Sequence, residues 1–127
     1  MVSYRRILLK LSGEALKSDN NNIDPEMLKK VVTIVQSALD LGVEIAIVIG
    51  GGNIYRGAAL ASDGMNKITG DHIGMLATVM NALAISDTFE RNNIRSIVMS
   101  GFSIGGGVCE TFNHTKAKNH LKAEETR

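Results

Sequence analysis

The sequence predicts an α/β fold of three layers, in which helices lie on both sides of a mainly parallel β-sheet. Three segments predict it: an apolar run at 7–11, a helical periodicity at 25–41 and a run rich in β-branched residues at 43–49. A strand, a helix and a strand in this order form a βαβ unit, whose strands are parallel and whose crossover is right-handed. Both strands are therefore expected to end at one edge of the sheet, where open α/β folds bind ligands.

Composition indicates one small globular domain. The chain has 127 residues, with 14 Lys and Arg against 13 Asp and Glu, and a net charge of +1 provides no basic surface for a nucleic-acid backbone. The single cysteine, Cys109, cannot form an intramolecular disulfide, which favours a cytosolic protein. No apolar run has the composition of a secretory signal or approaches the length of a membrane span. We expect a cytoplasmic protein that binds neither nucleic acid nor membrane.

The first strand, Ile7–Leu11, is apolar except for Lys10 and is therefore expected to be buried. Ser12 and Gly13 close it. Residues 17–23 then form a polar cluster whose Ser, Asp and Asn side chains compete for backbone hydrogen bonds, so this stretch is expected to be an exposed loop.

The first helix is expected at Pro25–Leu41. Asp24 is the type of residue that caps a helix N-terminus, Pro25 suits the first helical position, and Gly42 suits the left-handed position after the last turn. Apolar residues recur at intervals of three and four along one face: Leu28, Val31, Val32, Val35, Ala38 and Leu39. The following strand, Val43–Ile49, is expected to be covered on both faces because it is almost entirely apolar.

The second half of the chain is predicted to add a helix and a strand. The stretch 58–68 is expected to form a short helix and a loop, and a long helix is expected to start at Gly70 and Asp71 and run through Arg91. It is apolar nearly all round, so it is expected to be largely buried, with Met75 and Met80 filling the core. A third strand is predicted at 94–99, a flexible turn at 105–107, and one or two helical turns at 117–121.

Three successive glycines, Gly50–Gly52, follow the second strand. Their amides can converge on an anion, or the run can be only a tight turn. The dinucleotide pattern G-x-G-x-x-G fails because Tyr55 stands at its last glycine, and the P-loop pattern fails because Ala58 and Ala59 replace its Lys and Ser/Thr. Neither standard nucleotide loop is therefore present.

Three charged residues have both a functional and a structural interpretation. Lys10 interrupts an apolar strand, so its ammonium either reaches solvent or meets an anion at the strand end. Arg56 is either a phosphate partner or a solvated surface charge. Asp71 either caps the long helix or accepts hydrogen bonds from ligand hydroxyls.

Taken together, the motifs resemble those of the bacterial uridylate (UMP) kinases, within the amino-acid kinase superfamily. The resemblance extends from about residue 4 to about residue 112, and three segments carry it: Ile7–Ala15, Ile49–Asn53 with Arg56 and Gly57, and Gly70–Asn81. The first two indicate the superfamily alone, whereas Gly-Asp-His-x-Gly-Met-Leu-Ala-Thr narrows the resemblance to the UMP enzymes.

The resemblance implies the amino-acid kinase fold and transfer of a phosphoryl group from ATP, with Mg²⁺, to UMP in pyrimidine nucleotide synthesis. It implies that Lys10 is catalytic, and that no residue of the chain ligates a metal. The implied ATP-binding residues are Lys10, Leu11, Ser12, Gly13, Gly52 and Arg56, and the implied UMP-binding residues are Gly51 and Asp71. It also implies a homo-oligomer, since the family forms hexamers.

Members of that family are about twice as long as this chain. Residues 1–127 are therefore expected to be the N-terminal portion of a single kinase domain, with the UMP- and phosphate-binding half present, the adenine-binding half absent and the sheet incomplete at its C-terminus. The isolated chain is expected to be inactive. One alternative is a non-catalytic nucleotide-binding or assembly module. Another is a superfamily kinase for carbamate, glutamate, aspartate or acetylglutamate, although a ribose-binding Asp71 would serve none of those acids.

Overall fold

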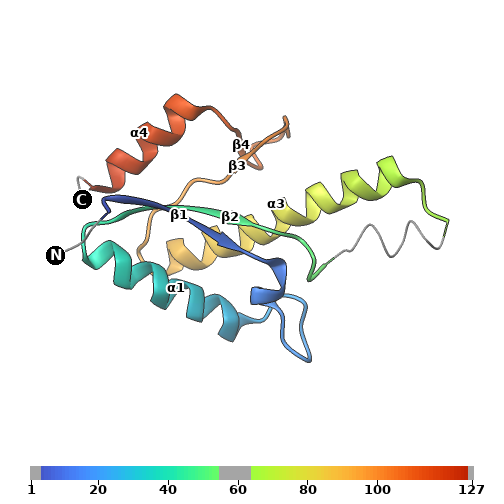
Figure 1. Ribbon diagram of the computed structural model, residues 1–127, viewed down its shortest axis with the longest axis horizontal. Helices are drawn as coiled ribbons and strands as arrows, with labels where there is room; N and C mark the ends of the chain where they lie inside the picture. Colours follow the sequence, from blue (N-terminus) through green and yellow to red (C-terminus); the bar gives the residue numbers. More distant parts are fainter. Residues whose placement is uncertain (1–3, 55–63, 126–127) are drawn as a thin grey trace.

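The computed structural model describes residues 4–54 and 64–125, and their elements are arranged in three layers (Figure 1). Arg56 and most of the predicted helix and loop at 58–68 lie outside the described residues. In chain order the elements are β1 (Arg6–Leu11), the short 3₁₀ helix η1 (Gly13–Leu16), α1 (Pro25–Asp40), β2 (Glu44–Ile49), α3 (Lys67–Arg91), β3 (Met99–Ser100), β4 (Glu110–Thr111) and α4 (His114–Glu125).

Strands β1 and β2 pair in parallel, with Arg6 opposite Glu44 and Leu11 opposite Ile49, which confirms the βαβ unit. Helices α1 and α3 contact each other and β2 on one side of this pair, and α4 contacts β2 from the other side (Figure 1). The three-layer αβα prediction is therefore confirmed. The described strands are all parallel, but they form two small sheets, β1–β2 and β3–β4, rather than one.

Helix α1 forms as its sequence predicts. The Asp24 carboxylate accepts a hydrogen bond from the Glu26 backbone N–H at 2.7 Å, and Pro25 occupies the first turn. Gly42 has φ +78°, the left-handed conformation expected after a helix end. The predicted apolar face is turned inward, and its most buried members are Leu28, Val31 and Val35.

The core lies between α1, α3 and the inner face of the β1–β2 pair. Leu16 of η1 is fully buried at its centre. The other buried members of this cluster are Leu28, Val31, Val35, Ile49, Ile85, Phe89 and Ile94. The short 3₁₀ helix therefore anchors the segment after β1 to the core.

The prediction that β1 is buried is wrong. Leu8 is 68% exposed, and Lys10 is exposed as well. Among the described strands β1 pairs only with β2, so its outer edge and outer face are uncovered. The prediction that β2 is covered on both faces is wrong at the strand's far end, because Val48 lies on the same outer face, opposite Lys10, and is 49% exposed.

The prediction of a strand at 94–99 is also wrong, because only Met99 and Ser100 are extended and paired. The reason lies in hydrogen bonds to α3. The Ser96 N–H donates to the Glu90 carboxylate at 3.1 Å, and the Ser96 hydroxyl lies 2.6 Å from that of Ser86. These bonds hold Ser96, in the middle of the segment, beside α3, so that its N–H does not pair with β2.

Helix α3 starts earlier than predicted and is less buried. It begins at Lys67, because the Asn66 side chain caps the first turn by accepting hydrogen bonds from the N–H groups of Ile68 and Thr69. Met75 and Met80 are 40% and 52% exposed, so their assignment to the core is wrong. Only the second half of the helix, around Ile85 and Phe89, enters the core cluster.

Helix α3 is also long and apolar enough to cross a membrane by length and composition alone, so the expectation that no segment meets that test does not hold for it. Core helices pass the same test. Here 28% of the relevant window is buried within the fold, where the helix contacts α1 and β2. We treat α3 as a helix that packs on the sheet.

Helix α4 is longer than the one or two turns predicted, because it covers 12 residues, His114–Glu125. The Asn113 side chain accepts a hydrogen bond from the Lys116 N–H at 3.0 Å and so caps its first turn. The turn predicted at 105–107 is confirmed, with positive φ at Gly106 and Gly107.

Candidate functional site

The ends of β1 and β2 are in contact at one edge of the sheet. The Gly50 N–H donates to the Leu11 carbonyl at 3.0 Å. A Cβ placed on Gly13 would lie 2.7 Å from the Gly52 nitrogen, closer than real side chains approach. The segment Ser12–Gly13 therefore lies directly against the three glycines Gly50–Gly52, which we call the glycine bend.

The glycine bend also lies directly on α3. A Cβ on Gly51 would be 2.9 Å from the Ala77 Cβ and 3.2 Å from the Gly74 carbonyl oxygen. None of the three glycines has a positive φ. Gly51 is therefore required as glycine because of its close approach to the helix, and not because of backbone conformation.

Two buried asparagines that the sequence analysis did not assign lie directly behind the glycine bend. Asn53 is 5% exposed and Asn81, on α3, is fully buried. Their side-chain amides bond to each other, and each also bonds to a backbone carbonyl. Asn81 is a single carboxamide among apolar neighbours on its helix, and that pattern is the signal that could have found it.

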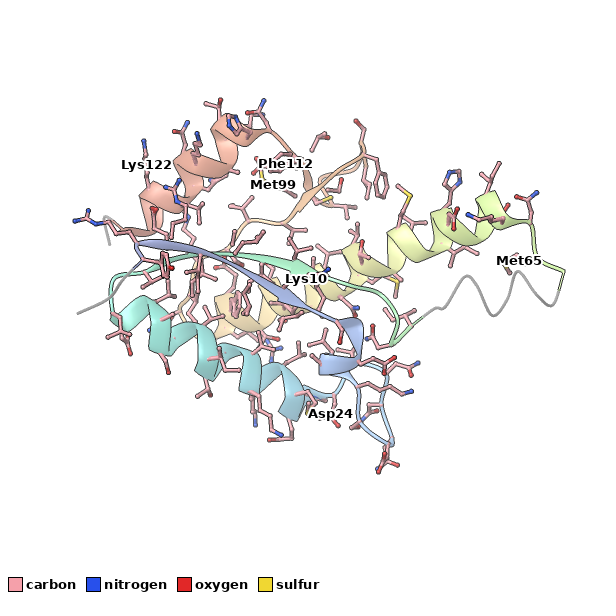
Figure 2. All side chains as sticks on the ribbon, in the orientation of Figure 1. Lys10, Asp24, Met65, Met99, Phe112 and Lys122 are labelled. Carbon is pink, nitrogen blue, oxygen red and sulfur yellow. The ribbon has the colours of Figure 1, made fainter. Side chains whose placement is uncertain are left out.

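Lys10 lies on β1, two residues before Ser12 (Figure 2). It is exposed, and among the described residues its ammonium has no hydrogen bond or ion pair. Strand geometry puts its backbone about 7 Å from that of Ser12. The exposure of Lys10 agrees with the first of the two interpretations offered by the sequence, an ammonium that reaches solvent, and it leaves the ammonium accessible to an anion.

Asp71 is not the cap of α3, since Asn66 is, and that interpretation is corrected. Its carboxylate lies in the second turn, is 58% exposed and pairs with the Lys67 ammonium at 3.0 Å. Asp71 lines an open groove of about 640 Å³ with Gly70, Gly74, Met75, Thr78, Gly101 and Phe102. Gly74 and Thr78, which line this groove, also lie next to Gly51 of the glycine bend.

The structure therefore brings together most of the residues singled out from the sequence. Leu11, Ser12 and Gly13 lie against Gly50 at the sheet edge, and Gly13 also lies against Gly52. Gly51 lies against the part of α3 that follows Asp71. The Ser12 side chain makes no capping bond to η1. Arg56 lies outside the described residues, so its predicted role stays a prediction.

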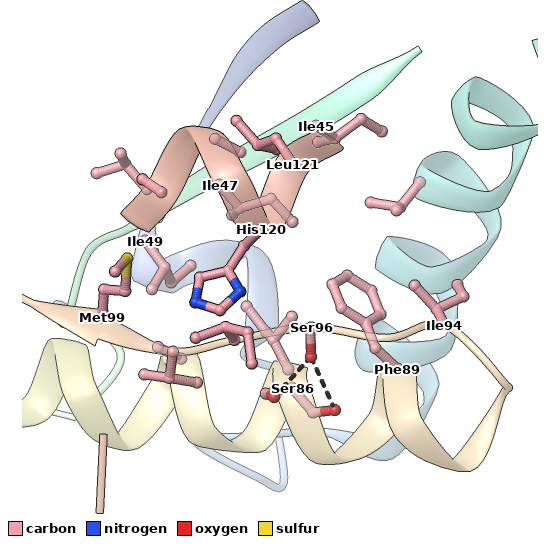
Figure 3. Close-up of a pocket in the computed structure, with 18 of the residues that line it drawn as sticks. Ile45, Ile47, Ile49, Ser86, Phe89, Ile94, Ser96, Met99, His120 and Leu121 are labelled. Atoms are coloured by element: carbon pink, nitrogen blue, oxygen red, sulfur yellow. Dashed lines mark hydrogen bonds between the residues drawn. The ribbon is translucent and has the colours of Figure 1, made fainter. Parts of the chain in front are cut away.

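A second hollow, of about 350 Å³, lies between β2, the segment 94–99 and α4 (Figure 3). Its walls are mainly apolar. Its polar lining residues include Arg95, His120 and the hydrogen-bonded pair Ser86 and Ser96, and Figure 3 labels the last three. The His120 Nε2 lies 3.4 Å from the Glu110 carboxylate. None of the residues predicted from the sequence to bind nucleotide lines this hollow.

The described residues also bear on metal binding. Within residues 4–54 and 64–125 no group of three or more His, Cys, Asp or Glu side chains is arranged to hold a metal ion. Asp71, the acidic residue in the groove, pairs with Lys67.

A parallel βαβ unit whose strand ends meet in glycines at one sheet edge defines an α/β protein with a ligand site at the carboxyl ends of its strands. The chain belongs to the amino acid kinase family, whose sequence profile matches residues 5–126.

Within this family the chain is similar to uridylate kinases. It is 65% identical over 121 residues to the uridylate kinase of Ruthia magnifica subsp. Calyptogena magnifica, covering 95% of this chain and 51% of that protein. It is 54% identical over 123 residues to that of Stutzerimonas stutzeri strain A1501, covering 96% and 49%. The chain spans about half the length of the curated relatives it matches.

The chain is also similar to solved structures of UMP kinases. The crystal structure of UMP kinase from Bacillus anthracis superimposes with a TM-score of 0.87 at 34% identity, covering 95% of this chain and 50% of that one. The structure of UMP kinase from Ureaplasma parvum superimposes with a TM-score of 0.85 at 27% identity, covering 97% and 52%.

Proposed function

We propose that the chain is the UMP- and phosphate-binding portion of a kinase that transfers the γ-phosphoryl group of ATP to UMP. The observation that carries the proposal is the contact between the β1 end and the glycine bend, which places the Ser12–Gly13 backbone against Gly50 and Gly52, just after the exposed Lys10. Similarity to uridylate kinases over nearly the whole chain supports the substrate pair.

Each part of the site has a separate role in this proposal. The Lys10 ammonium and the amides of Ser12–Gly13 and Gly52 bind the ATP phosphates, and Arg56 adds a second cation. Gly51 lets the UMP phosphate approach the backbone, and the Asp71 carboxylate accepts hydrogen bonds from the ribose hydroxyls. Asp71 must exchange its ion pair with Lys67 for those hydroxyls, which is inexpensive because both side chains are largely exposed.

In the proposed reaction an oxygen of the UMP phosphate attacks the γ-phosphorus of ATP. The bond from that phosphorus to the β–γ bridging oxygen breaks, so that UDP and ADP form. Little covalent chemistry is required of the protein in phosphoryl transfer, and alignment and charge stabilisation provide most of the catalysis. Lys10 stabilises the charge on the transferred group. Mg²⁺ would accompany the ATP phosphates and neutralise part of their charge.

Nucleotide binding is the activity that we propose for the chain itself, and turnover is the activity of the complete kinase. The relatives are about twice as long as this chain. We further propose cytoplasmic location, where both nucleotides are made, and self-association through α3. The exposed apolar residues Ile68, Leu76, Met80 and Leu83, spaced along that helix, support the second point.

Calorimetric titration tests the proposed substrates. Wild-type protein is expected to bind UMP and ATP, and Asp71→Asn is expected to weaken UMP binding by about tenfold while leaving ATP binding unchanged, since a lost hydrogen bond to a charged group costs about 1.5–3 kcal/mol. Asp87→Asn is the matched control, because Asp87 is an exposed α3 carboxylate paired with Arg91 at 2.9 Å, as Asp71 is with Lys67.

Absence of UMP and ATP binding by the wild-type chain would contradict the proposed function. Equal UMP affinity in Asp71→Asn and wild type would contradict the role of Asp71 alone. A coupled assay of ADP release tests the proposal that the chain binds nucleotides but only the complete kinase turns them over. UMP-dependent turnover by the chain at the rate of a complete homologue would refute it.

A further inference from the structure

Asn53 and Asn81 form a reciprocal amide pair behind the glycine bend. The Asn81 Nδ2 donates to the Asn53 Oδ1 at 2.7 Å, and the Asn53 Nδ2 donates to the Asn81 Oδ1 at 3.1 Å. The remaining donors reach backbone carbonyls, from Asn81 to Gly50 at 2.7 Å and from Asn53 to Asn22 at 2.8 Å. The pair thus joins three separate segments: the loop before α1, the end of β2 and α3.

The backbone carbonyls fix which way each amide points. A carbonyl oxygen can only accept, so the atom of Asn81 that faces Gly50 and the atom of Asn53 that faces Asn22 must both be Nδ2. Each Oδ1 is then left to accept from the other side chain. This arrangement satisfies both carboxamides, and among the described residues no buried side-chain polar atom is without a partner.

The bond to Gly50 determines the direction of the next amide. In a trans peptide the C=O of one residue and the N–H of the following residue point to opposite sides. Because the Gly50 carbonyl is held toward Asn81 on α3, the Gly51 N–H points away from that bond. The Gly51 carbonyl accepts from the Ile54 N–H at 3.0 Å, which in the same way fixes the direction of the Gly52 N–H.

The pair also controls the distance between the two strand ends. The Asn53 carboxamide occupies the space that a Cβ of Gly13 would need, so that Gly13 and Asn53 are in direct contact. The position of Asn53 is set by its bonds to Asn81 and Asn22. A shift of this carboxamide would therefore move the Ser12–Gly13 segment relative to the glycine bend.

We propose that Asn53 and Asn81 are positioning residues that aim the Gly51 and Gly52 amides at the phosphate groups of the bound nucleotides. The proposal rests on the proposed function, because the phosphates belong to UMP and ATP. Neither side chain touches the ligand. Their effect passes through the peptide units they hold, and preorganised backbone donors of this kind stabilise phosphate charge more effectively than mobile ones.

The test compares Asn81→Asp with wild type in the whole chain. An aspartate has nearly the same shape but cannot donate to Gly50 or Asn53. The matched control is Thr88→Val, which removes another buried side-chain hydrogen bond of α3, from Thr88 Oγ1 to the Ala84 carbonyl at 2.9 Å. Thr88 lies about two helical turns after Asn81. Calorimetry with UMP and ATP is carried out at a temperature at which each protein is fully folded.

Asn81→Asp is expected to bind both nucleotides at least about tenfold more weakly, with the Gly51 and Gly52 amide resonances displaced in the nucleotide-free spectrum. Thr88→Val is expected to bind within about twofold of wild type, because single hydrogen bonds remote from a ligand alter stability and not affinity. Unchanged nucleotide affinity in folded Asn81→Asp would overturn the proposal and leave the pair a purely structural one.

If Asn81→Asp does not fold, hydrogen exchange in the wild-type chain tests the proposal. The side-chain amide protons of Asn53 and Asn81 are expected to exchange with solvent much more slowly than those of the exposed Asn119. Equal exchange rates would overturn the proposal. If the wild-type chain binds no nucleotide, the proposed function fails, while the exchange rates and the glycine resonances still decide whether the pair positions the bend.

Discussion

Replacing Gly13 by alanine is a direct perturbation of the contact between the two strand ends. The added Cβ would lie 2.7 Å from the Gly52 nitrogen and 3.0 Å from the Asn53 nitrogen. Ordinary contact begins at 3.4 Å, so the strand ends must separate by about 0.7 Å unless the backbone distorts elsewhere. Both neighbours are backbone atoms, and no side-chain rotation can relieve the clash.

Overpacking of this kind costs about 1–3 kcal/mol. In a domain of this size it lowers the melting temperature by roughly 3–15 °C. Nucleotide affinity is expected to fall as well, because the Gly52 amide and the Ser12–Gly13 amides no longer converge. The free energy of unfolding is measured by urea denaturation, and the affinity for ATP by calorimetry on the folded variant.

Gly105→Ala is the control, because a Cβ there meets nothing within 4 Å and its φ is not positive. It is expected to leave ATP affinity unchanged and stability within about 1 kcal/mol of wild type. If Gly13→Ala has the same urea midpoint and the same ATP affinity as wild type, the strand ends are not in the contact described, and the reasoning is refuted.

Two further predictions concern stability. Leu16→Ala is expected to destabilise the chain by about 2–5 kcal/mol in urea denaturation, because Leu16 is fully buried in the core cluster, and a loss below about 1 kcal/mol would contradict its central place there. Hydrogen bonds from the Ser18 side chain and then the Glu26 backbone lower the pKa of Asp24 below its ordinary 3.8, so its contribution to stability is complete above that pH and is lost as the pH falls through the lowered pKa. The wild-type urea midpoint is therefore expected to fall relative to that of Asp24→Asn below pH 3.8, and a constant difference from pH 7 to pH 3 would contradict this cause.

The elements predicted most accurately are those whose signals are local. Helix α1 carries its own cap in Asp24, its own stop in Gly42 and a regular apolar face, so its bounds could be predicted within a residue. The parallel pairing of β1 and β2 followed from the connection between them, since a helix of this length crosses back over the sheet.

Burial and pairing were harder to predict, because they depend on neighbours far apart in the sequence. The apolar run of β1 is typical of a buried strand, yet the described residues place no element against its outer face. The segment at 94–98 has the composition of a strand, but hydrogen bonds of Ser96 with Glu90 and Ser86 hold its middle beside α3. Only tertiary contacts settle such competition.

The candidate site likewise has some residues with local sequence signals and others that depend on distant neighbours. The glycines and Lys10 could be identified because their residue types are unusual at the ends of apolar strands. The roles of Asn53 and Asn81 could not, because an amide pair 28 residues apart has no local pattern. Asp71 was found by its motif, whereas its pairing with Lys67 became visible only when α3 proved to begin four residues earlier.

The most direct test of the central claim is to follow the backbone amide resonances of the chain during titration with ATP and UMP. We expect the largest displacements of amide resonances at Gly13, Gly51 and Gly52, together with a change in the Lys10 side-chain resonance. Displacements confined to the apolar hollow beside β2, with the glycine resonances unmoved at saturation, would contradict it.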